Sequence, residues 1–204
     1  MELQKFVDLP VSPEMHRAVA ELGFEEMTPV QSSSIMPIME GRDVTAQAPT
    51  GTGKTAAFGI PLIERIDPEE SEIQGLVLCP TRELALQTAS ELHKFCKYKS
   101  GIRVLPVFGG QPIERQITGL KQRPKILVAT PGRLMDHMRR HTISLDKVRM
   151  VVLDEADEML DMGFRDDIAE ILSTMPEDRQ TELFSATLAP EILEIAETYQ
   201  KDAE

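Results

Sequence analysis

Short apolar runs alternate with amphipathic stretches along most of this 204-residue chain. Apolar runs of four or five residues are typical of strands buried on both faces, whereas the amphipathic stretches have helical spacing. The predicted strands cover residues 43–46, 75–79, 104–108, 126–129, 150–153 and 182–185. The predicted helices among and after them cover residues 54–66, 82–99, 112–121, 132–140, 165–174 and 190–200. This alternation indicates an α/β fold with a mostly parallel sheet that is covered on both faces.

Two more helices are predicted ahead of the first strand. Ser12 and Pro13 have the chemistry of a helix start, and Gly23 is a typical helix stop. Thr28 and Gln31 have the spacing of a capping box at the start of the next helix. The spacing alone therefore favours a bond from the Gln31 side chain to the backbone N–H of Thr28 over any contact with a ligand.

A glycine-rich turn, APTGTGKT at residues 48–55, follows the first predicted strand. Its glycines permit backbone angles that aim several N–H groups at an anion, and the helix that follows presents its positive dipole end to the same place. In such a cradle Lys54 reaches the β- and γ-phosphates of a nucleotide, and the Thr55 hydroxyl ligates Mg²⁺. Ala48 stands where the strict P-loop pattern has its first glycine. A plain strand-to-helix connection is the alternative.

Three carboxylates, Asp154, Glu155 and Asp157, directly follow the apolar run 150–153. Repulsion among close carboxylates is relieved by a divalent cation, and Mg²⁺ prefers oxygen ligands. An aspartate at a strand end, opposite a Gly-Lys-Thr turn, is the Walker-B arrangement for the metal of a nucleoside triphosphate, and a glutamate beside it can accept a proton from the attacking water. A solvated acidic helix start is the alternative. The phosphate cradle elsewhere in the chain favours the catalytic interpretation.

Composition limits the partners and the compartment. The net charge of −12, from 22 basic and 34 acidic residues, argues against a broad surface that wraps nucleic acid. Any such contact must be local and use backbone N–H groups, hydroxyls and a few arginines. The sequence shows neither a signal peptide nor an apolar run long enough to span a membrane, so a cytoplasmic protein is expected. Cys79 and Cys96 are expected to be buried, reduced thiols.

A series of short motifs connects these sites along the chain. They lie at residues 23–31, 48–55, 80–87, 109–110, 130–133, 154–157 and 185–187. In order they resemble the Q motif, motif I, motif Ia, the GG doublet, motif Ib, the DEAD motif and motif III of the DEAD-box RNA helicases, specifically of their N-terminal RecA-like domain. This family tends to have alanine where the strict P-loop has its first glycine, so Ala48 supports the resemblance.

The resemblance covers almost the whole chain. It implies a RecA-like three-layer α/β/α fold, with residues 1–204 as a single ATP-binding domain and with ATP and Mg²⁺ as cofactors. The Q motif region would cover residues 6–31, the P-loop residues 48–55 and the DEAD box residues 154–157.

The resemblance also assigns the nucleotide contacts. Gln31 would read the adenine edge, and Phe6 would stack on the adenine ring. This role replaces the capping preference for Gln31, although both bonds can coexist. The residues implied to hold the phosphates and Mg²⁺ are Ala48, Thr50, Gly51, Thr52, Gly53, Lys54 and Thr55.

The implied catalytic residues are Lys54, Asp154, Glu155, Asp157, Ser185 and Thr187. Asp154 would hold the metal through water, with Thr55 as the other metal-binding residue, and Glu155 would activate the hydrolytic water. Asp157 would link the site to Ser185 and Thr187, in the segment that couples hydrolysis to RNA release or strand separation in this family.

RNA is the implied macromolecular partner. The residues implied to contact its sugar-phosphate backbone are Thr81, Arg82, Gly110, Thr130 and Arg133. Backbone contacts need little net positive charge and predict weak sequence preference, and contacts to the 2′-hydroxyl would favour RNA over DNA. Taken singly, these residues have plainer alternatives as turn glycines and helix-start charges.

The chain departs from the family pattern in three places. Met27 stands where proline is usual, and Pro49 where glutamine is common; neither change removes a side chain that does chemistry, and the sequence leaves open whether a shift of the local backbone alters nucleotide affinity. After Thr187 only one helical pattern precedes Glu204, whereas the family continues into a second RecA-like domain with an arginine finger. Such an arginine is worth about 10³ to 10⁵ in rate, so this chain is expected to bind nucleotide but hydrolyse it poorly.

The leading hypothesis is the ATP-binding half of an ATP-dependent RNA helicase that unwinds short duplexes or remodels RNA–protein complexes. The alternatives are an ATP-gated RNA clamp or scaffold with little turnover, and a DNA helicase that shares the same core.

Overall fold

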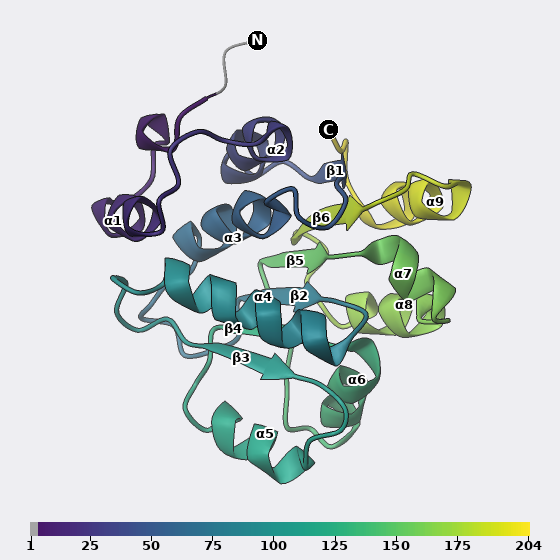
Figure 1. Ribbon diagram of the computed structural model, residues 1–204. Coiled ribbons are helices and arrows are strands. Elements are labelled where there is room, and N and C mark those ends of the chain that lie inside the picture. Colours follow the sequence, from purple (N-terminus) through teal and green to yellow (C-terminus); the bar gives the residue numbers. More distant parts are fainter. Residues whose placement is uncertain (1–3) are drawn as a thin grey trace.

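The computed structural model describes residues 4–204, which form a three-layer α/β/α arrangement around one sheet (Figure 1). The strands lie in the order β1-β6-β5-β2-β4-β3, and every neighbouring pair is parallel. Their bounds are β1 Val44–Gln47, β2 Gly75–Leu78, β3 Val104–Val107, β4 Ile126–Ala129, β5 Met150–Leu153 and β6 Gln180–Ser185. The predicted α/β fold and all the predicted strands are confirmed, with ends that differ by at most two residues.

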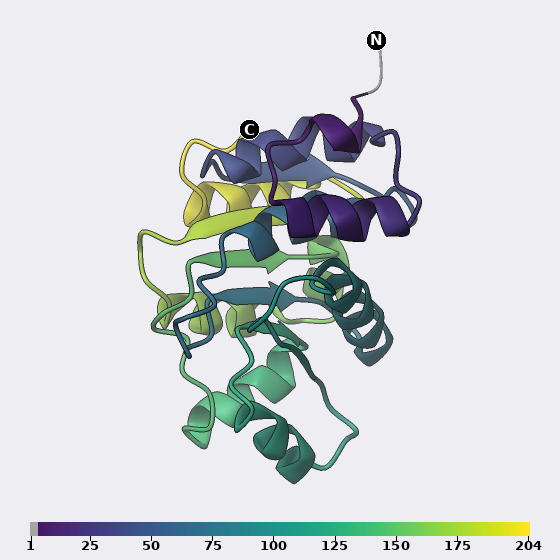
Figure 2. The same cartoon turned by 90° about the vertical axis from the view of Figure 1, so that its left-hand side faces the viewer.

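Helices cover both faces of the sheet (Figures 1 and 2). One face packs against α1 (Pro13–Glu21), α2 (Pro29–Met39), α3 (Lys54–Glu64) and α4 (Arg82–Phe95), and the other against α6 (Pro131–Arg139), α7 (Ala156–Asp161), α8 (Arg165–Ser173) and α9 (Pro190–Tyr199). Helix α5 (Ile113–Leu120) lies beside β3, and a 3₁₀ turn, η1, covers Phe6–Asp8. In β5, Val152 joins one core layer and Val151 the other, because successive strand residues point to opposite faces.

Helix α7 is the one α-helix of the described chain that the sequence did not predict. It has six residues, and Ala156 and Met159 are its buried ones. So short and acidic a segment has too few apolar positions to show a helical period. It begins at Ala156, inside the DEAD motif, which agrees with the helix start that was considered as the alternative for these carboxylates.

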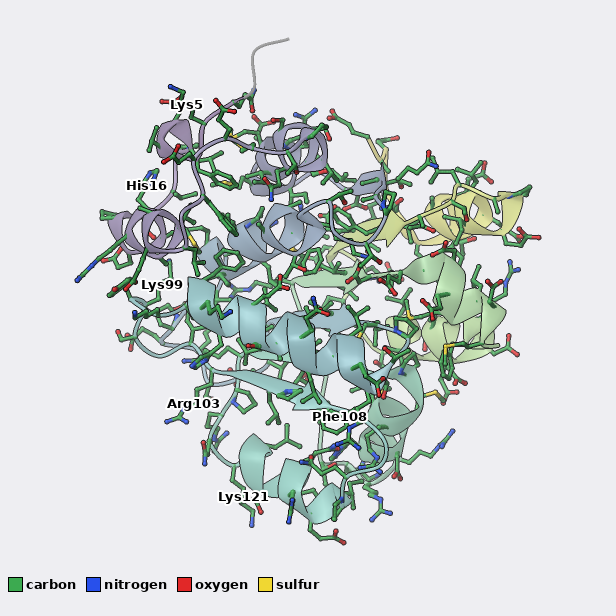
Figure 3. The ribbon with its side chains drawn as sticks, in the orientation of Figure 1. Lys5, His16, Lys99, Arg103, Phe108 and Lys121 are labelled. Atoms are coloured by element: carbon green, nitrogen blue, oxygen red, sulfur yellow. The ribbon has the colours of Figure 1, made fainter. Side chains whose placement is uncertain are left out.

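All the strands end at the same edge of the sheet, where the expected motifs gather. Phe108, directly after β3, lies at this carboxyl edge, and Arg103, directly before β3, lies at the opposite one (Figure 3). Because the order is β1-β6-β5-β2-β4-β3, the P-loop, the DEAD motif and motif III follow three neighbouring strands. Motif Ia, motif Ib and the GG doublet follow the other three. The edge therefore has two halves, which we name after the roles that the resemblance implies: the nucleotide half (β1, β6, β5) and the RNA half (β2, β4, β3).

Two expectations from composition can be compared with the structure. Cys79 and Cys96 are both buried and unpaired, as predicted, and burial raises the pKa of both thiols. Over residues 4–204, no helix has both the length and the apolar character needed to cross a membrane.

Candidate functional site

The P-loop needs its glycines for conformation and for space. Gly51 and Gly53 have φ values of +86° and +81°, which L-residues with a side chain rarely adopt. A Cβ on Gly53 would also lie 2.3 Å from Nε2 of Gln31. Gly53 is the N-cap of α3, and Lys54 is the first helical residue. The unpaired backbone N–H groups of the first turn of α3 therefore lie at the cradle.

Gln31 joins the Q motif region to the P-loop. Its Oε1 accepts from the backbone N–H of Thr28 at 2.9 Å, which confirms the predicted capping box. Its Nε2 donates to the carbonyl oxygen of Gly53 at 3.0 Å, and the Thr28 hydroxyl donates to the carbonyl oxygen of Thr52 at 2.8 Å. Both ends of the Gln31 amide are thus bonded within the chain, and the cap positions the P-loop.

Phe6, the residue expected to stack on adenine, is a packing group in this structure. Its side chain is 3% exposed, and its ring centroid lies 5.5 Å from that of Phe24. A base can therefore stack on this ring only after the packing around Phe6 opens.

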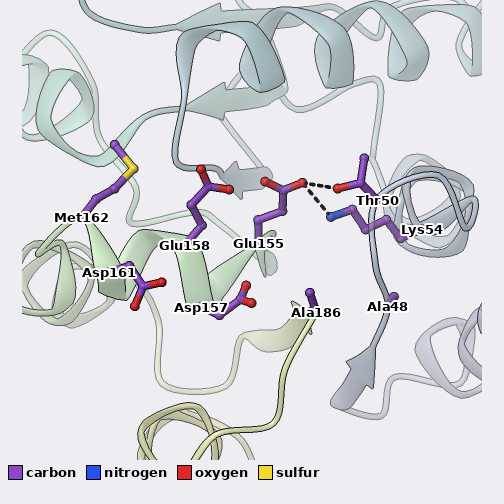
Figure 4. A pocket seen from close by; sticks show the side chains of 9 residues that line it. All are labelled: Ala48, Thr50, Lys54, Glu155, Asp157, Glu158, Asp161, Met162 and Ala186. Carbon is purple, nitrogen blue, oxygen red and sulfur yellow. Dashed lines mark hydrogen bonds and ion pairs between the residues drawn. The ribbon is translucent and has the colours of Figure 1, made fainter.

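A buried ion cluster connects the P-loop to the end of β5 (Figure 4). Lys54 Nζ lies 3.0 Å from Oδ1 of Asp154 and 3.2 Å from Oε1 of Glu155, and the Thr50 hydroxyl donates to the same oxygen of Glu155 at 3.0 Å. Asp154 is fully buried, and this burial raises its pKa although Lys54 opposes the shift. Burial acts on Glu155 in the same direction, but Lys54 and the Thr50 hydroxyl outweigh it and hold the pKa of Glu155 below its usual value.

Asp157 of the DEAD motif lies apart from Asp154 and Glu155, which share Lys54. Glu155 has a φ of +51°, unusual for a residue with a side chain, and this turn separates the directions of its neighbours. Asp154 points into the buried cluster, whereas Asp157 lies on α7 with Oδ2 3.4 Å from the Thr187 hydroxyl. No group of three or more acidic, histidine or cysteine side chains in residues 4–204 is placed to bind a metal ion.

The fit to Mg²⁺ rests on Asp154 and Thr55. Both carboxylate oxygens of Asp154 are buried; Oδ1 faces the Lys54 ammonium at 3.0 Å, whereas Oδ2 has no hydrogen-bond partner, so the group is only partly compensated for its lost solvation. Thr55 is half-buried in the first turn of α3. One carboxylate, one hydroxyl and otherwise water and phosphate oxygens suit Mg²⁺, which keeps several of its waters.

Motif III contacts the DEAD motif through one of its two hydroxyls. Thr187 reaches Asp157, as described above, whereas the Ser185 Oγ is buried without a hydrogen-bond partner. The Ser185 carbonyl oxygen instead accepts from the backbone N–H of Ala48 at 2.8 Å. The structure therefore joins Ser185 to the P-loop strand and Thr187 to Asp157.

A cleft of about 510 Å³ lies between these motifs. The residues that line it are Ala48, Thr50, Lys54, Glu155, Asp157, Glu158, Asp161, Met162 and Ala186. Glu158, Asp161 and Met162 were not predicted as site residues. The sequence gives only a weak signal for these three residues. Their spacing of three and four positions places the side chains on one face only if the segment is helical, and this helix was not predicted. The cleft contains four carboxylates and one lysine, so it is strongly acidic.

On the RNA half, Arg82 lies against the GG doublet. Thr81 caps α4, since its hydroxyl accepts from the backbone N–H of Leu84 at 3.2 Å, and Arg82 is the first helical residue. The Arg82 guanidinium lies over the ring of Phe108, 5.1 Å from its centroid. Gly110 has a φ of +87°, and a Cβ there would approach Nη1 of Arg82 to 3.3 Å, so the turn needs glycine.

Arg133 approaches the same turn from α6. Thr130 is the N-cap of α6, and half-buried Arg133 lies in the helix's first turn. Its Nη1 donates to the carbonyl oxygen of Gln111 at 2.7 Å, directly after the GG doublet. The structure thus brings together Arg82, Gly110 and Arg133, which lie far apart in sequence.

An entirely parallel sheet covered by helices, with a P-loop after one strand and an acidic strand end two strands away, defines a RecA-like nucleotide-binding domain. The model of the DEAD/DEAH box helicase family matches residues 28–195. The chain therefore belongs to this family.

Individual relatives agree with the family. An ATP-dependent RNA helicase CshA from Limosilactobacillus reuteri is 53% identical over 200 residues, which are 98% of this chain and 40% of that protein. A DEAD-box ATP-dependent RNA helicase CshA from Bacillus subtilis is 53% identical over 199 residues, again 98% of this chain and 40% of the relative. The crystal structure of a DEAD box protein from Methanococcus jannaschii superposes with a TM-score of 0.94 at 40% identity, covering 100% of this chain and 56% of that one. The chain thus spans about two fifths of the curated relatives.

Proposed function

We propose that this chain is the ATP-binding half of an ATP-dependent RNA helicase, which couples ATP binding and hydrolysis to local unwinding of RNA duplexes or remodelling of RNA–protein complexes. The observation that carries the proposal is the meeting of Lys54 with Asp154 and Glu155, at 3.0 and 3.2 Å. A P-loop lysine and the carboxylates of a neighbouring strand end converge where a triphosphate would lie.

The nucleotide enters as its magnesium complex. Four carboxylates line the cleft beside a single lysine, so an uncompensated triphosphate would be repelled. Thr55 and Asp154 would hold Mg²⁺, which would supply charge that compensates the phosphates. In this binding step Lys54 exchanges its carboxylate partners for phosphate oxygens, and the P-loop N–H groups cradle the phosphates.

Glu155 acts as the base for the hydrolytic water. Its lowered pKa keeps it ionised near neutral pH, so it can accept a proton. When Lys54 moves to the phosphates, Glu155 loses a bond to that lysine and gains basicity at the point where ATP is bound. Asp157 and Thr187 then transmit the state of the site to motif III.

RNA lies across the RNA half and is contacted through its backbone by Thr81, Arg82, Gly110, Thr130 and Arg133. Two helix N-termini, those of α4 and α6, point toward the same edge and add N–H donors for phosphates. This local set is compatible with a net charge of −12 and predicts weak sequence preference.

The proposed catalytic unit includes a second RecA-like domain, which supplies an arginine finger and the other half of both surfaces, and the protein works in the cytoplasm. The 204-residue chain then binds nucleotide and hydrolyses it very slowly.

The test is steady-state ATP hydrolysis by this chain with and without single-stranded RNA, beside ADP binding and with Glu155→Gln as the control for contamination. We expect ADP binding and negligible hydrolysis. RNA-stimulated hydrolysis that disappears in Glu155→Gln would show that the chain needs no second domain. Failure to bind ADP or ATP would overturn the nucleotide site itself.

A further inference from the structure

Gln116, on α5, is a buried polar residue that none of the expected motifs includes. Its side chain is 1% exposed, and its Nε2 donates to the carbonyl oxygen of Phe108 at 2.8 Å and to Oε1 of Gln111 at 3.1 Å. These two acceptors flank the GG doublet on either side. The side-chain amide of Gln116 therefore bonds the residues on both sides of the GG doublet and holds the turn together.

The other end of the same amide contacts α6. Oε1 of Gln116 lies 2.8 Å from Nε2 of His137 and accepts from Nη1 of Arg133 at 3.3 Å. Because the Phe108 carbonyl can only accept, the nitrogen of the amide must face it and the oxygen must face α6. The proton of the His137 ring then lies on Nε2, which leaves Nδ1 as an acceptor 2.8 Å from the Thr142 hydroxyl; the single proton of that hydroxyl also faces the His137 carbonyl oxygen at 3.0 Å.

His137 makes this arrangement rigid. It is fully buried, and it lies one helical turn after Arg133 on α6, so the two side chains share a face. Burial, with Arg133 nearby, lowers the pKa of His137, which favours the neutral ring and adds no second positive charge beside Arg133. Every polar atom of the Gln116 side chain is bonded, and a fully bonded buried network has one geometry.

We propose that Gln116 is a positioning residue for RNA binding, which holds the GG turn and the Arg133 guanidinium in one fixed arrangement. The inference rests on the proposed function, because it assumes that RNA lies on Gly110 and Arg133. Gln116 itself lies beneath the surface and touches no phosphate. An apolar residue of similar size would fill the same space but leave the Phe108 carbonyl, the Gln111 side chain and His137 without their partner.

The experiment is a titration of the ¹⁵N-labelled 204-residue chain with single-stranded oligouridine at low salt, followed by NMR, beside a separate ADP titration. The variant is Gln116→Leu. Its matched control is Gln74→Leu, because Gln74 is equally buried and bonds the backbone N–H and carbonyl of Asp67 at 2.8 Å each, at the opposite edge of the sheet. We expect Gln116→Leu to weaken RNA binding at least fivefold and to leave ADP affinity within twofold, since a lost hydrogen bond is worth about 1 kcal/mol. Gln74→Leu should leave both affinities within twofold.

A double-mutant cycle with Arg133→Ala separates positioning from general destabilisation. We expect Arg133→Ala to weaken RNA binding in the wild type and to add little in the Gln116→Leu background, because that background has already released the arginine. Two outcomes would overturn the positioning role of Gln116 but leave the placement of RNA intact. One is that the losses in RNA affinity of the two single variants multiply fully in the double variant. The other is that Gln116→Leu binds RNA as the wild type does while Arg133→Ala binds it more weakly. Unchanged RNA affinity in Arg133→Ala would overturn the placement of RNA on this edge and the positioning role with it.

If Gln116→Leu does not fold, Gln116→Glu is measured in the same way. It keeps the oxygen that faces α6 and loses both donated bonds to the GG turn, so RNA affinity should again fall. Wild-type affinity in that variant would overturn the proposal.

Discussion

The two halves of the carboxyl edge use buried polar groups in different ways. The nucleotide half contains a charged buried cluster, in which Lys54 is paired with Asp154 and Glu155, beside the neutral Gln31 amide that bonds Gly53. In the RNA half the buried groups, Gln116 and His137, are neutral and fully hydrogen-bonded to one another and to the backbone. The first half must exchange partners when its ligand enters, whereas the second is already formed and only presents arginines and N–H groups.

This difference has a physical reason. A buried ion pair is costly to break unless another charge replaces the lost partner, so ligand entry and charge exchange are coupled. A neutral network has no such coupling and mainly fixes geometry. Under the proposed function, the cluster that must change with each cycle of hydrolysis consists of ions, and the network that would hold an RNA backbone in register consists mainly of neutral groups.

Glu155→Gln should have the largest effect, on hydrolysis. Loss of the proposed base should lower the rate by about 10² to 10⁴ in a form of the protein that includes the proposed second domain. Nucleotide affinity should be kept, since the substitution removes a negative charge from an acidic cleft. The same variant should hold ATP and RNA together in a closed state, which RNA titrations with and without ATP would measure. Equal RNA affinity in the two titrations would contradict a clamp driven by ATP.

Lys54→Ala should come next and would test the charged half directly. Removing the single cation of the cluster should weaken Mg·ADP binding by about 100-fold, because a hydrogen bond to a charged group is worth roughly 1.5–3 kcal/mol. Isothermal titration would measure the affinity. Lys99→Ala is the matched control, because Lys99 also forms an ion pair, with Glu64 at an N···O distance of 3.3 Å, and this pair lies outside the cleft (Figure 3). An equal loss in both variants would mean that the Lys54 effect is one of stability.

Glu182, in β6, extends the comparison to a titrating group without a cation partner. It is fully buried; its Oε2 accepts from the backbone N–H of Val44 at 2.7 Å and its Oε1 has no partner. Burial raises its pKa to about 8, and Asp43 adds to the shift, whereas the Val44 N–H, the Gln180 side chain and Arg65 oppose it.

The folded protein therefore holds a proton on Glu182 that the unfolded chain releases above its ordinary pKa near 4.5. The free energy of unfolding should fall as the pH rises from that value to about 8, by at most about 1.4 kcal/mol per pH unit. Glu182→Gln lacks this pH-dependent contribution. The melting temperature of the variant minus that of the wild type should therefore be larger at pH 8 than at pH 5. A difference that is the same at both pH values would show that the carboxyl does not titrate in this range.

Arg82→Ala should have the smallest effect, on RNA binding alone. Arg82 is exposed and contacts the GG turn without belonging to a buried network. Its loss should therefore weaken oligouridine binding a few-fold and reduce the salt dependence of that binding by about one phosphate contact. The affinity for ADP should stay unchanged. Arg103→Ala, at the opposite edge of the sheet, is the control. A large loss of ADP affinity would show that the two halves are not separable.

Local patterns were sufficient for much of this structure. The strands followed from apolar runs, the caps at Ser12 and Thr28 from side-chain chemistry, and the P-loop glycines from the angles that the turn requires. The resemblance located both halves of the edge because its motifs are contiguous short segments. Helix α7 was missed because six acidic-rich residues carry no readable period.

What the sequence determined by itself is therefore the α/β alternation, the family and the residues able to do chemistry, since each depends on neighbours along the chain. The tertiary structure decided the strand order that separates the two halves, the pairing of Lys54 with Asp154 and Glu155, and the burial of Phe6. It also decided that the Gln31 amide contacts Gly53 and that Gln116 joins the GG turn to Arg133 and His137. Apart from the bonds of Gln116 to Phe108 and Gln111, these features depend on contacts between residues more than ten positions apart, whose energies arise only when the chain is packed.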